Sequence, residues 1–186
     1  MNKGVLILGG ARSGKSTFAE SLAKSLTHKV LYIATAIPFD DGMRDRIKKH
    51  QKNRPSEWKT VEKYRGFEGL RDFDEFIGAD VILLDCITVM ITNLMLDEAC
   101  DYDQITHEEL DNIENRIVNQ IDVLLDELEA SGKKYILVSN EVGLGLVPPY
   151  KLGNYFRDIA GRINQRIASV VGEVYFVVSG IQMKIK

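Results

Sequence analysis

Short apolar runs rich in β-branched residues alternate along the chain with segments whose apolar positions recur at helical spacing. Five runs are continuous, which is typical of strands covered by helices on both faces of a sheet. The pattern therefore predicts an α/β fold of βαβ units around a mostly parallel sheet. The predicted strands are 5–8, Val30–Ala34, 81–84, 135–139 and 174–178, with edge strands at Lys59–Glu62 and 183–186.

Three helices are predicted between these strands. The first starts inside the glycine-rich segment 9–16 and runs to about Leu26, and another spans about 150–171. The longest starts at Thr106, which has the spacing of a capping box with Glu109, and Gly132 suits the position after its end. Its apolar positions are Ile113, Ile117, Ile121, Leu124, Leu125 and Leu128.

The segment GGARSGKS, residues 9–16, satisfies the pattern G-x-x-x-x-G-K-[ST] through Gly9, Gly14, Lys15 and Ser16. It lies between a predicted strand and a predicted helix, the context that this motif requires. Backbone N–H groups and the helix N-terminus would hold phosphate oxygens, Lys15 would reach the outer phosphates, and Ser16 would bind Mg²⁺. The alternative is a chance match in a glycine turn.

Two carboxylates follow strands at the edge where this loop lies. Asp85 ends the run VILLD, where it would meet a metal ion beside the phosphate loop. The alternative is a cap at the strand end. Glu141 opens the Gly/Pro-rich loop 141–149 at the same edge, so the sequence leaves open which of the two serves the metal.

A histidine lies on a basic stripe in segment 41–54. On a helix of about 100° per residue, Met43, Arg46, Ile47, His50 and Arg54 share one face. Flanking guanidinium groups disfavour the protonated imidazole, which keeps it nucleophilic toward a phosphorus atom. The alternative is a packed core histidine with surface arginines beside it.

Composition limits the remaining possibilities. The 186 residues, 45% hydrophobic and 27% charged, predict a single domain over 1–186. The net charge of −3 without a basic block argues against nucleic acid as a partner, and no apolar run is long enough for a membrane span. Two cysteines without an export signal predict reduced thiols and a cytoplasmic location.

The chain resembles the bifunctional adenosylcobinamide kinase/adenosylcobinamide-phosphate guanylyltransferase family of cobalamin biosynthesis. The resemblance rests on seven blocks that occur in order from the phosphate loop to the C-terminus. They are GGARSGKSTFAE, YIATA, DDGMRDRIKKHQKNRPSEWKTVE, LLDCITVMITN, SNEVGLGLVP, FRDIAGRINQRIA and the closing SGIQMKIK.

The resemblance implies a P-loop NTPase fold of the RecA-like kind, a homotrimer and two reactions at one nucleotide site. The aminopropanol hydroxyl of the corrinoid first takes a phosphoryl group from ATP or GTP. GMP then passes from GTP through His50 to the new phosphate. The family's nucleotide contacts correspond here to Gly9, Gly10, Ala11, Arg12, Ser13, Gly14, Lys15, Ser16, Ile33, Ala34, Thr35, Gln51, Lys52, Asn53, Arg54, Glu62 and Asp85.

Three other functions fit part of this pattern. A P-loop small-molecule kinase without guanylyltransferase activity needs the phosphate loop but not His50. A GTPase switch reads guanine with N-K-x-D, and this tetrapeptide is absent from the sequence. A DNA-dependent ATPase disagrees with the negative charge.

Overall fold

The computed structural model describes residues 3–37 and 54–186, whose strands form a seven-stranded sheet in the order β3-β2-β4-β5-β1-β6-β7. Strands β1 to β6 run parallel, and β7 pairs antiparallel with β6. The strands are β1 (Gly4–Gly9), β2 (Val30–Ala34), β3 (Lys59–Glu62), β4 (Val81–Asp85), β5 (Lys134–Val138), β6 (Glu173–Val178) and β7 (Ile181–Lys184). The predicted α/β fold with a mostly parallel sheet is confirmed.

Successive side chains of the central strands enter two separate hydrophobic layers. In β1, Val5 and Ile7 belong to one layer, whereas Leu6 and Leu8 belong to the other. All four are buried. A strand that is buried on both faces gains from apolar residues at every position, which explains the continuous runs in the sequence.

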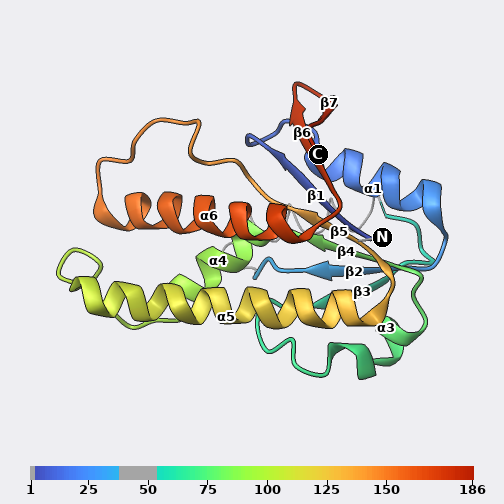
Figure 1. The fold of residues 1–186 in the computed structure, drawn as a ribbon, viewed down its shortest axis with the longest axis horizontal. Helices are drawn as coiled ribbons and strands as arrows, with labels where there is room; N and C mark the ends of the chain where they lie inside the picture. Colours follow the sequence, from blue (N-terminus) through green and yellow to red (C-terminus); the bar gives the residue numbers. More distant parts are fainter. Residues whose placement is uncertain (1–2, 38–53) are drawn as a thin grey trace.

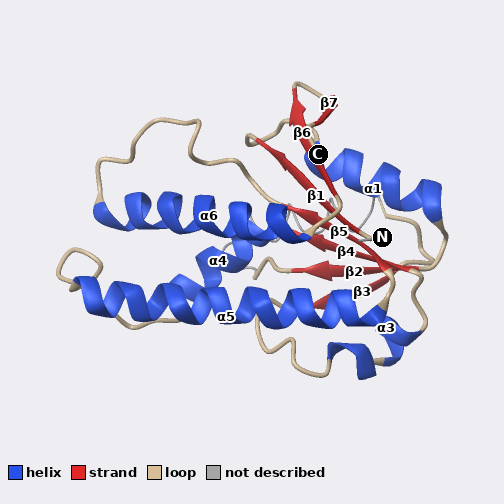
Figure 2. Cartoon of the chain, viewed as in Figure 1, coloured by secondary structure: helices blue, strands red, loops and turns tan. Residues whose placement is uncertain are grey.

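Helices cover both faces of the sheet (Figures 1 and 2). Helix α1 packs on one face, and α4, α5 and α6 pack on the other. The helices are α1 (Lys15–Leu26), the short α3 (Asp74–Ile77), α4 (Ile87–Leu96), α5 (His107–Ser131) and α6 (Lys151–Val170), with a 3₁₀ turn η1 (Leu70–Asp72). Within the described ranges, no helix has the length and apolar character needed to cross a bilayer.

Helix α5 has the ends that the sequence predicts. The Thr106 hydroxyl accepts a hydrogen bond from the Glu109 N–H at 3.2 Å, and the Glu109 carboxylate accepts one from the Thr106 N–H at 2.9 Å. Gly132 follows the last turn with φ 65°, a conformation that favours glycine. Its six predicted apolar positions are all buried.

Helix α4 is not among the helices that the pattern predicts. Its sequence, ITVMITNLML, is apolar nearly throughout and rich in β-branched residues, so it lacks the polar stripe of a surface helix. Ile87, Met90, Ile91 and Met95 are buried, and so are the polar Thr88 and Asn93. A helix enclosed in this way shows no amphipathic period, which explains why the pattern missed it.

The C-terminal edge strand lies two residues earlier than predicted. β7 begins at Ile181, which pairs with Val178 across a turn in which Ser179 and Gly180 both have positive φ. This tight turn fixes the register of the hairpin, so the regular strand ends at Lys184, and Ile185 and Lys186 make irregular backbone hydrogen bonds with Val174 of β6.

Candidate active site

The phosphate loop lies at the carboxyl edge of the sheet, where β1 passes into α1. Gly9 and Gly14 adopt φ values of 153° and 98°, which glycine adopts most easily. A Cβ atom on Gly9 would lie 2.3 Å from the Val177 carbonyl oxygen, so no side chain fits there. The motif therefore has the predicted strand–loop–helix context, in which backbone N–H groups can converge on phosphate.

Lys15 is the first residue of α1 and is only 7% exposed. Its Nζ donates a hydrogen bond of 2.7 Å to the Gly10 carbonyl oxygen, which folds the side chain back over the loop. Burial lowers the pKa of the Lys15 amine, while the nearby Asp85 carboxylate acts in the opposite direction. The ammonium group is therefore held inside the loop, close to a negative charge.

Asp85 ends β4 beside this loop and is linked to Tyr32 on β2. The Tyr32 hydroxyl donates a hydrogen bond of 3.1 Å to Asp85 Oδ2. Burial, reinforced by the Asp85 charge, raises the pKa of Tyr32, so the phenol stays a donor at every physiological pH. The carboxylate is thereby oriented at the end of its strand.

Arg54 stacks on the other side of the same tyrosine, with its guanidinium carbon 3.3 Å from the centre of the Tyr32 ring. Its Nε and Nη1 atoms are buried and have no hydrogen-bond partner among the described residues. The Ser13 hydroxyl in the phosphate loop shares this property. Buried donors without partners are rare, and an anion at this edge would satisfy them.

The end of β2 is fastened to the segment that follows β4. Thr35 Oγ1 donates to the Cys86 carbonyl oxygen at 2.8 Å and accepts from the Cys86 N–H at 2.9 Å. Asn93 of α4 donates to the Thr35 carbonyl oxygen at 2.7 Å. Burial raises the pKa of the Cys86 thiol to about 11, so it is neutral at pH 7 and unsuited to act as a nucleophile.

Two further predicted contact segments end at this edge. The Ile33 and Thr35 side chains are buried. Segment 33–35 would therefore offer a ligand mainly its backbone atoms and the Ala34 side chain. Glu62 ends β3 directly opposite Ala34. The predicted residues Gly9–Ser16, 33–35, Glu62 and Asp85 therefore lie at the carboxyl ends of β1, β2, β3 and β4, whereas Arg54 precedes β3 in the chain and joins this group through its contact with Tyr32.

Not all predicted residues can be placed. His50, Gln51, Lys52 and Asn53 lie outside the described residues, as does most of the predicted helix 41–54. Arg54, the last residue of that predicted helix, is in a bend.

A buried polar network that the sequence reasoning missed connects the ends of β4 and β5 with α6. Asn164 of α6 accepts a hydrogen bond from the Ser139 hydroxyl at 2.7 Å and donates to the Asn140 carbonyl oxygen at 3.0 Å. The Asn140 amide donates in turn to Thr88 Oγ1 at 2.7 Å. The available signal was the polar pair Ser-Asn directly after an apolar strand, where a parallel sheet carries its site.

Two side chains at this edge carry oxygen atoms that could bind a hard divalent cation. Ser16 offers a hydroxyl in the first turn of α1, and Asp85 offers a carboxylate at the neighbouring strand end. Glu141, the second candidate carboxylate, accepts the Gly143 N–H with Oε1 at 3.2 Å. Among the described residues, no three His, Cys, Asp or Glu side chains gather as a metal cage.

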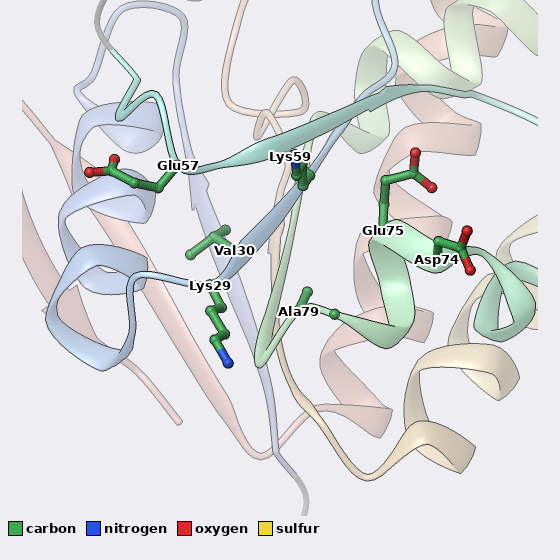
Figure 3. Close-up of a pocket in the computed structure, with 8 residues that line it drawn as sticks. Lys29, Val30, Glu57, Lys59, Asp74, Glu75 and Ala79 are labelled. Atoms are coloured by element: carbon green, nitrogen blue, oxygen red, sulfur yellow. The ribbon is translucent and has the colours of Figure 1, made fainter.

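A pocket of about 420 Å³ lies at the opposite edge of the sheet (Figure 3). It is bordered by Lys29 and Lys59 near the starts of β2 and β3, and by Glu57, Asp74 and Glu75. Ligands of open parallel sheets bind at the carboxyl ends of strands, and this pocket is at the amino ends. It is therefore separate from the phosphate loop.

Comparison with known proteins matches residues 5–185 to the family described as cobinamide kinase/cobinamide phosphate guanyltransferase. The bifunctional adenosylcobalamin biosynthesis protein CobU is 44% identical in Escherichia coli K12 and 45% identical in Salmonella typhimurium LT2, each alignment covering 98% of this chain and 99% of the relative. The CobP protein of Pseudomonas aeruginosa is 39% identical, over 97% of this chain and 96% of the relative.

Among solved structures, the flagellar accessory protein FlaH of Methanocaldococcus jannaschii aligns with a TM-score of 0.48 and 14% identity. The alignment covers 99% of this chain and 78% of FlaH, and the similarity is too low to bear on function. The near-complete family match and the relatives above 40% identity are decisive: the chain belongs to the cobinamide kinase/cobinamide phosphate guanyltransferase family.

Proposed function

We propose that this bifunctional transferase of cobalamin biosynthesis carries out both reactions at the carboxyl edge described above, with one nucleotide site. The observation that carries the proposal is the buried Lys15 inside a formed phosphate loop, beside Asp85. Gly9–Ser16 would hold the phosphates, while 33–35, 51–54 and Glu62 would contact the rest of the nucleotide.

In the kinase reaction, the aminopropanol hydroxyl of adenosylcobinamide attacks the γ-phosphorus of ATP or GTP. The new O–P bond forms as the bond to the β–γ bridging oxygen breaks, and the hydroxyl proton is lost to solvent. Little covalent chemistry is required of the protein, so positioning and charge neutralisation dominate. Lys15 supplies a fixed positive charge for the outer phosphates, and the unpaired donors of Ser13 and Arg54 supply further hydrogen bonds.

In the guanylyltransferase reaction, an imidazole nitrogen of His50 attacks the α-phosphorus of GTP. The N–P bond forms as the α–β bond breaks and pyrophosphate leaves. A phosphate oxygen of the corrinoid then attacks the same phosphorus and releases the imidazole, which gives adenosylcobinamide-GDP. Splitting the transfer in this way replaces one difficult displacement with two in-line steps. The assignment of His50 rests on the family resemblance and on the arginines beside it in the sequence.

Mg²⁺ belongs to the proposal as a partner of the nucleotide. Ser16 and Asp85 would hold it, directly or through water, because their oxygens lie on adjoining elements at the phosphate loop. When bound, Mg²⁺ would neutralise charge on the phosphates. A homotrimer and a cytoplasmic location are proposed from the family resemblance and from the cysteine content.

The test is mass spectrometry of the protein after incubation with GTP and Mg²⁺, together with labelling from α-labelled GTP. We expect a mass gain of one GMP on His50, and no label in His50→Ala. His28→Ala, which changes an exposed histidine, is the matched control and should label normally. Labelling of His50→Ala at the wild-type level would exclude His50 from the mechanism. Only the kinase reaction of the proposed function would then remain.

A further inference from the structure

The loop between β5 and α6 exposes an unusual amount of apolar side chain. Leu144, Leu146 and Val147 are 76%, 95% and 70% exposed, and Tyr150 is 59% exposed. The loop extends past the carboxyl ends of the strands (Figure 1). Adjacent exposed apolar side chains generally mark a surface that another molecule covers.

The near end of this loop is attached directly to the phosphate loop. The Glu141 N–H donates to the Gly9 carbonyl oxygen at 3.0 Å, and the Asn140 amide is fixed to Thr88 at 2.7 Å. Five residues separate Glu141 from Leu146, a span of at most about 18 Å even when fully extended. The apolar side chains therefore lie within reach of a molecule that is bound at the outer phosphates.

The far end of the loop is equally well fixed. The Asn154 amide donates to the carbonyl oxygens of Pro148 at 2.9 Å and Tyr150 at 3.1 Å. Gly153 allows these residues to pack on the first turn of α6, because a Cβ there would lie 2.7 Å from both Pro148 and Tyr150. Between the ends, the Gly145 N–H donates to the Val142 carbonyl oxygen at 3.1 Å. The leucines are thus held outward by a supported backbone.

We propose that Leu144, Leu146 and Val147 form the docking surface for the corrin ring of the acceptor. This inference rests on the proposed phosphoryl-transfer site, because it requires the acceptor hydroxyl to lie near Lys15. The short aminopropanol arm then brings the macrocycle beside the phosphate loop. The rim of a corrin carries methyl groups between its amide side chains, and these methyl groups complement leucine and valine side chains, whereas a triphosphate offers no apolar contact. A preformed apolar surface lowers the ordering cost of binding so large a ligand.

The test is the double variant Leu144→Ser/Leu146→Ser, assayed as a kinase with adenosylcobinamide and GTP. The KM for adenosylcobinamide should rise tenfold or more, whereas the KM for GTP should stay within twofold. Ile77→Ser on α3 removes a side chain of 62% exposure at the opposite edge and should change neither constant. Equilibrium dialysis without GTP, followed by corrinoid absorbance, should show the same loss of affinity.

A small acceptor separates docking from catalysis. N-Acetyl-1-amino-2-propanol carries the reacting hydroxyl without the corrin, and its slow phosphorylation should be equal in the wild type and the double variant. An unchanged KM for adenosylcobinamide, or an equal loss with the small acceptor, would overturn the proposal. Light scattering tests the remaining alternative. A change of oligomer mass in the double variant would mean that a second copy of the chain, and not the corrin, covers the loop, and would overturn the proposal. Absence of kinase activity in the wild type would count against the proposed function instead.

Discussion

Replacing Asn164 by alanine should destabilise the protein strongly, because this amide is enclosed and fully engaged. Asn164 is 4% exposed, and its two hydrogen bonds reach Ser139 and Asn140. Losing two such bonds costs about 2 kcal/mol, and leaving the buried Ser139 hydroxyl unpaired adds about 1–2 kcal/mol. We therefore expect the free energy of unfolding to fall by about 3–4 kcal/mol, and Tm by roughly 6–16 °C.

The measurement is equilibrium unfolding in urea, followed by the fluorescence of Trp58, the single tryptophan of the chain, which is 7% exposed. Asn119→Ala on the exposed side of α5 is the control and should stay within about 0.5 kcal/mol. The double variant Ser139→Ala/Asn164→Ala removes the orphaned hydroxyl as well. It should be more stable than the sum of the single effects predicts, by about 1 kcal/mol.

Two results would refute this reasoning. If Asn164→Ala costs no more than Asn119→Ala, the network does not hold the ends of β4 and β5. If the two single effects add, the Ser139 hydroxyl has found another partner and the proposed cost of an orphaned group is wrong.

Two further predictions concern charged groups, one in the phosphate loop and one at the start of β6, near the opposite edge of the sheet. Lys15→Ala should slow the kinase reaction about 10³-fold. Lys24→Ala, on the exposed side of α1, is the control and should keep the wild-type rate. An unchanged kinase rate in Lys15→Ala would exclude Lys15 from catalysis. Hydrogen bonds from Lys184, Lys134 and Tyr175 lower the pKa of Glu173 from 4.5 to about 2. Because the folded pKa is the lower one, this stabilisation is complete above about pH 4.5 and disappears as the pH falls toward 2. In urea unfolding, Glu173→Gln should therefore lower the free energy of unfolding by about 1–2 kcal/mol at pH 7, after allowance for solvent screening, and by little near pH 2. An equal loss of stability at both pH values would contradict this prediction.

The strands and the phosphate loop were predictable because their signals are local. A parallel strand that is covered on both faces favours an apolar residue at every position, and the loop needs glycine where φ is positive, so both requirements appear in consecutive letters of the sequence. Helix α4 was missed for a physical reason: it is apolar nearly throughout, so it lacks the polar stripe by which a helix is recognised.

Contacts between distant segments left no such signal. Ser139 and Asn164 are 25 residues apart, and Tyr32 and Asp85 are 53 apart. Tyr32 and Asp85 meet because β2 and β4 are neighbours in the sheet, and Ser139 and Asn164 meet because α6 passes the end of β5. Sequence reasoning could place Asp85 and Arg54 near the nucleotide by resemblance, but it could not show that one tyrosine contacts both.

Two features at the carboxyl edge of the sheet lack a partner, one polar and one apolar. Each of them corresponds to one of the two substrates of the family. Ser13 and Arg54 carry buried donor atoms without partners among the described residues, which is costly unless an anion completes their hydrogen bonds. In the β5–α6 loop, whose first residue Glu141 is hydrogen-bonded to Gly9, the leucine side chains are exposed to water, which favours contact with an apolar surface of another molecule. A triphosphate offers leucines no apolar contact, and adenosylcobinamide brings no phosphate to a buried guanidinium group. An edge that needed only a nucleotide would have no reason to hold a supported apolar loop beside its phosphate loop, so the pairing of these deficits argues for two ligands that meet at Lys15.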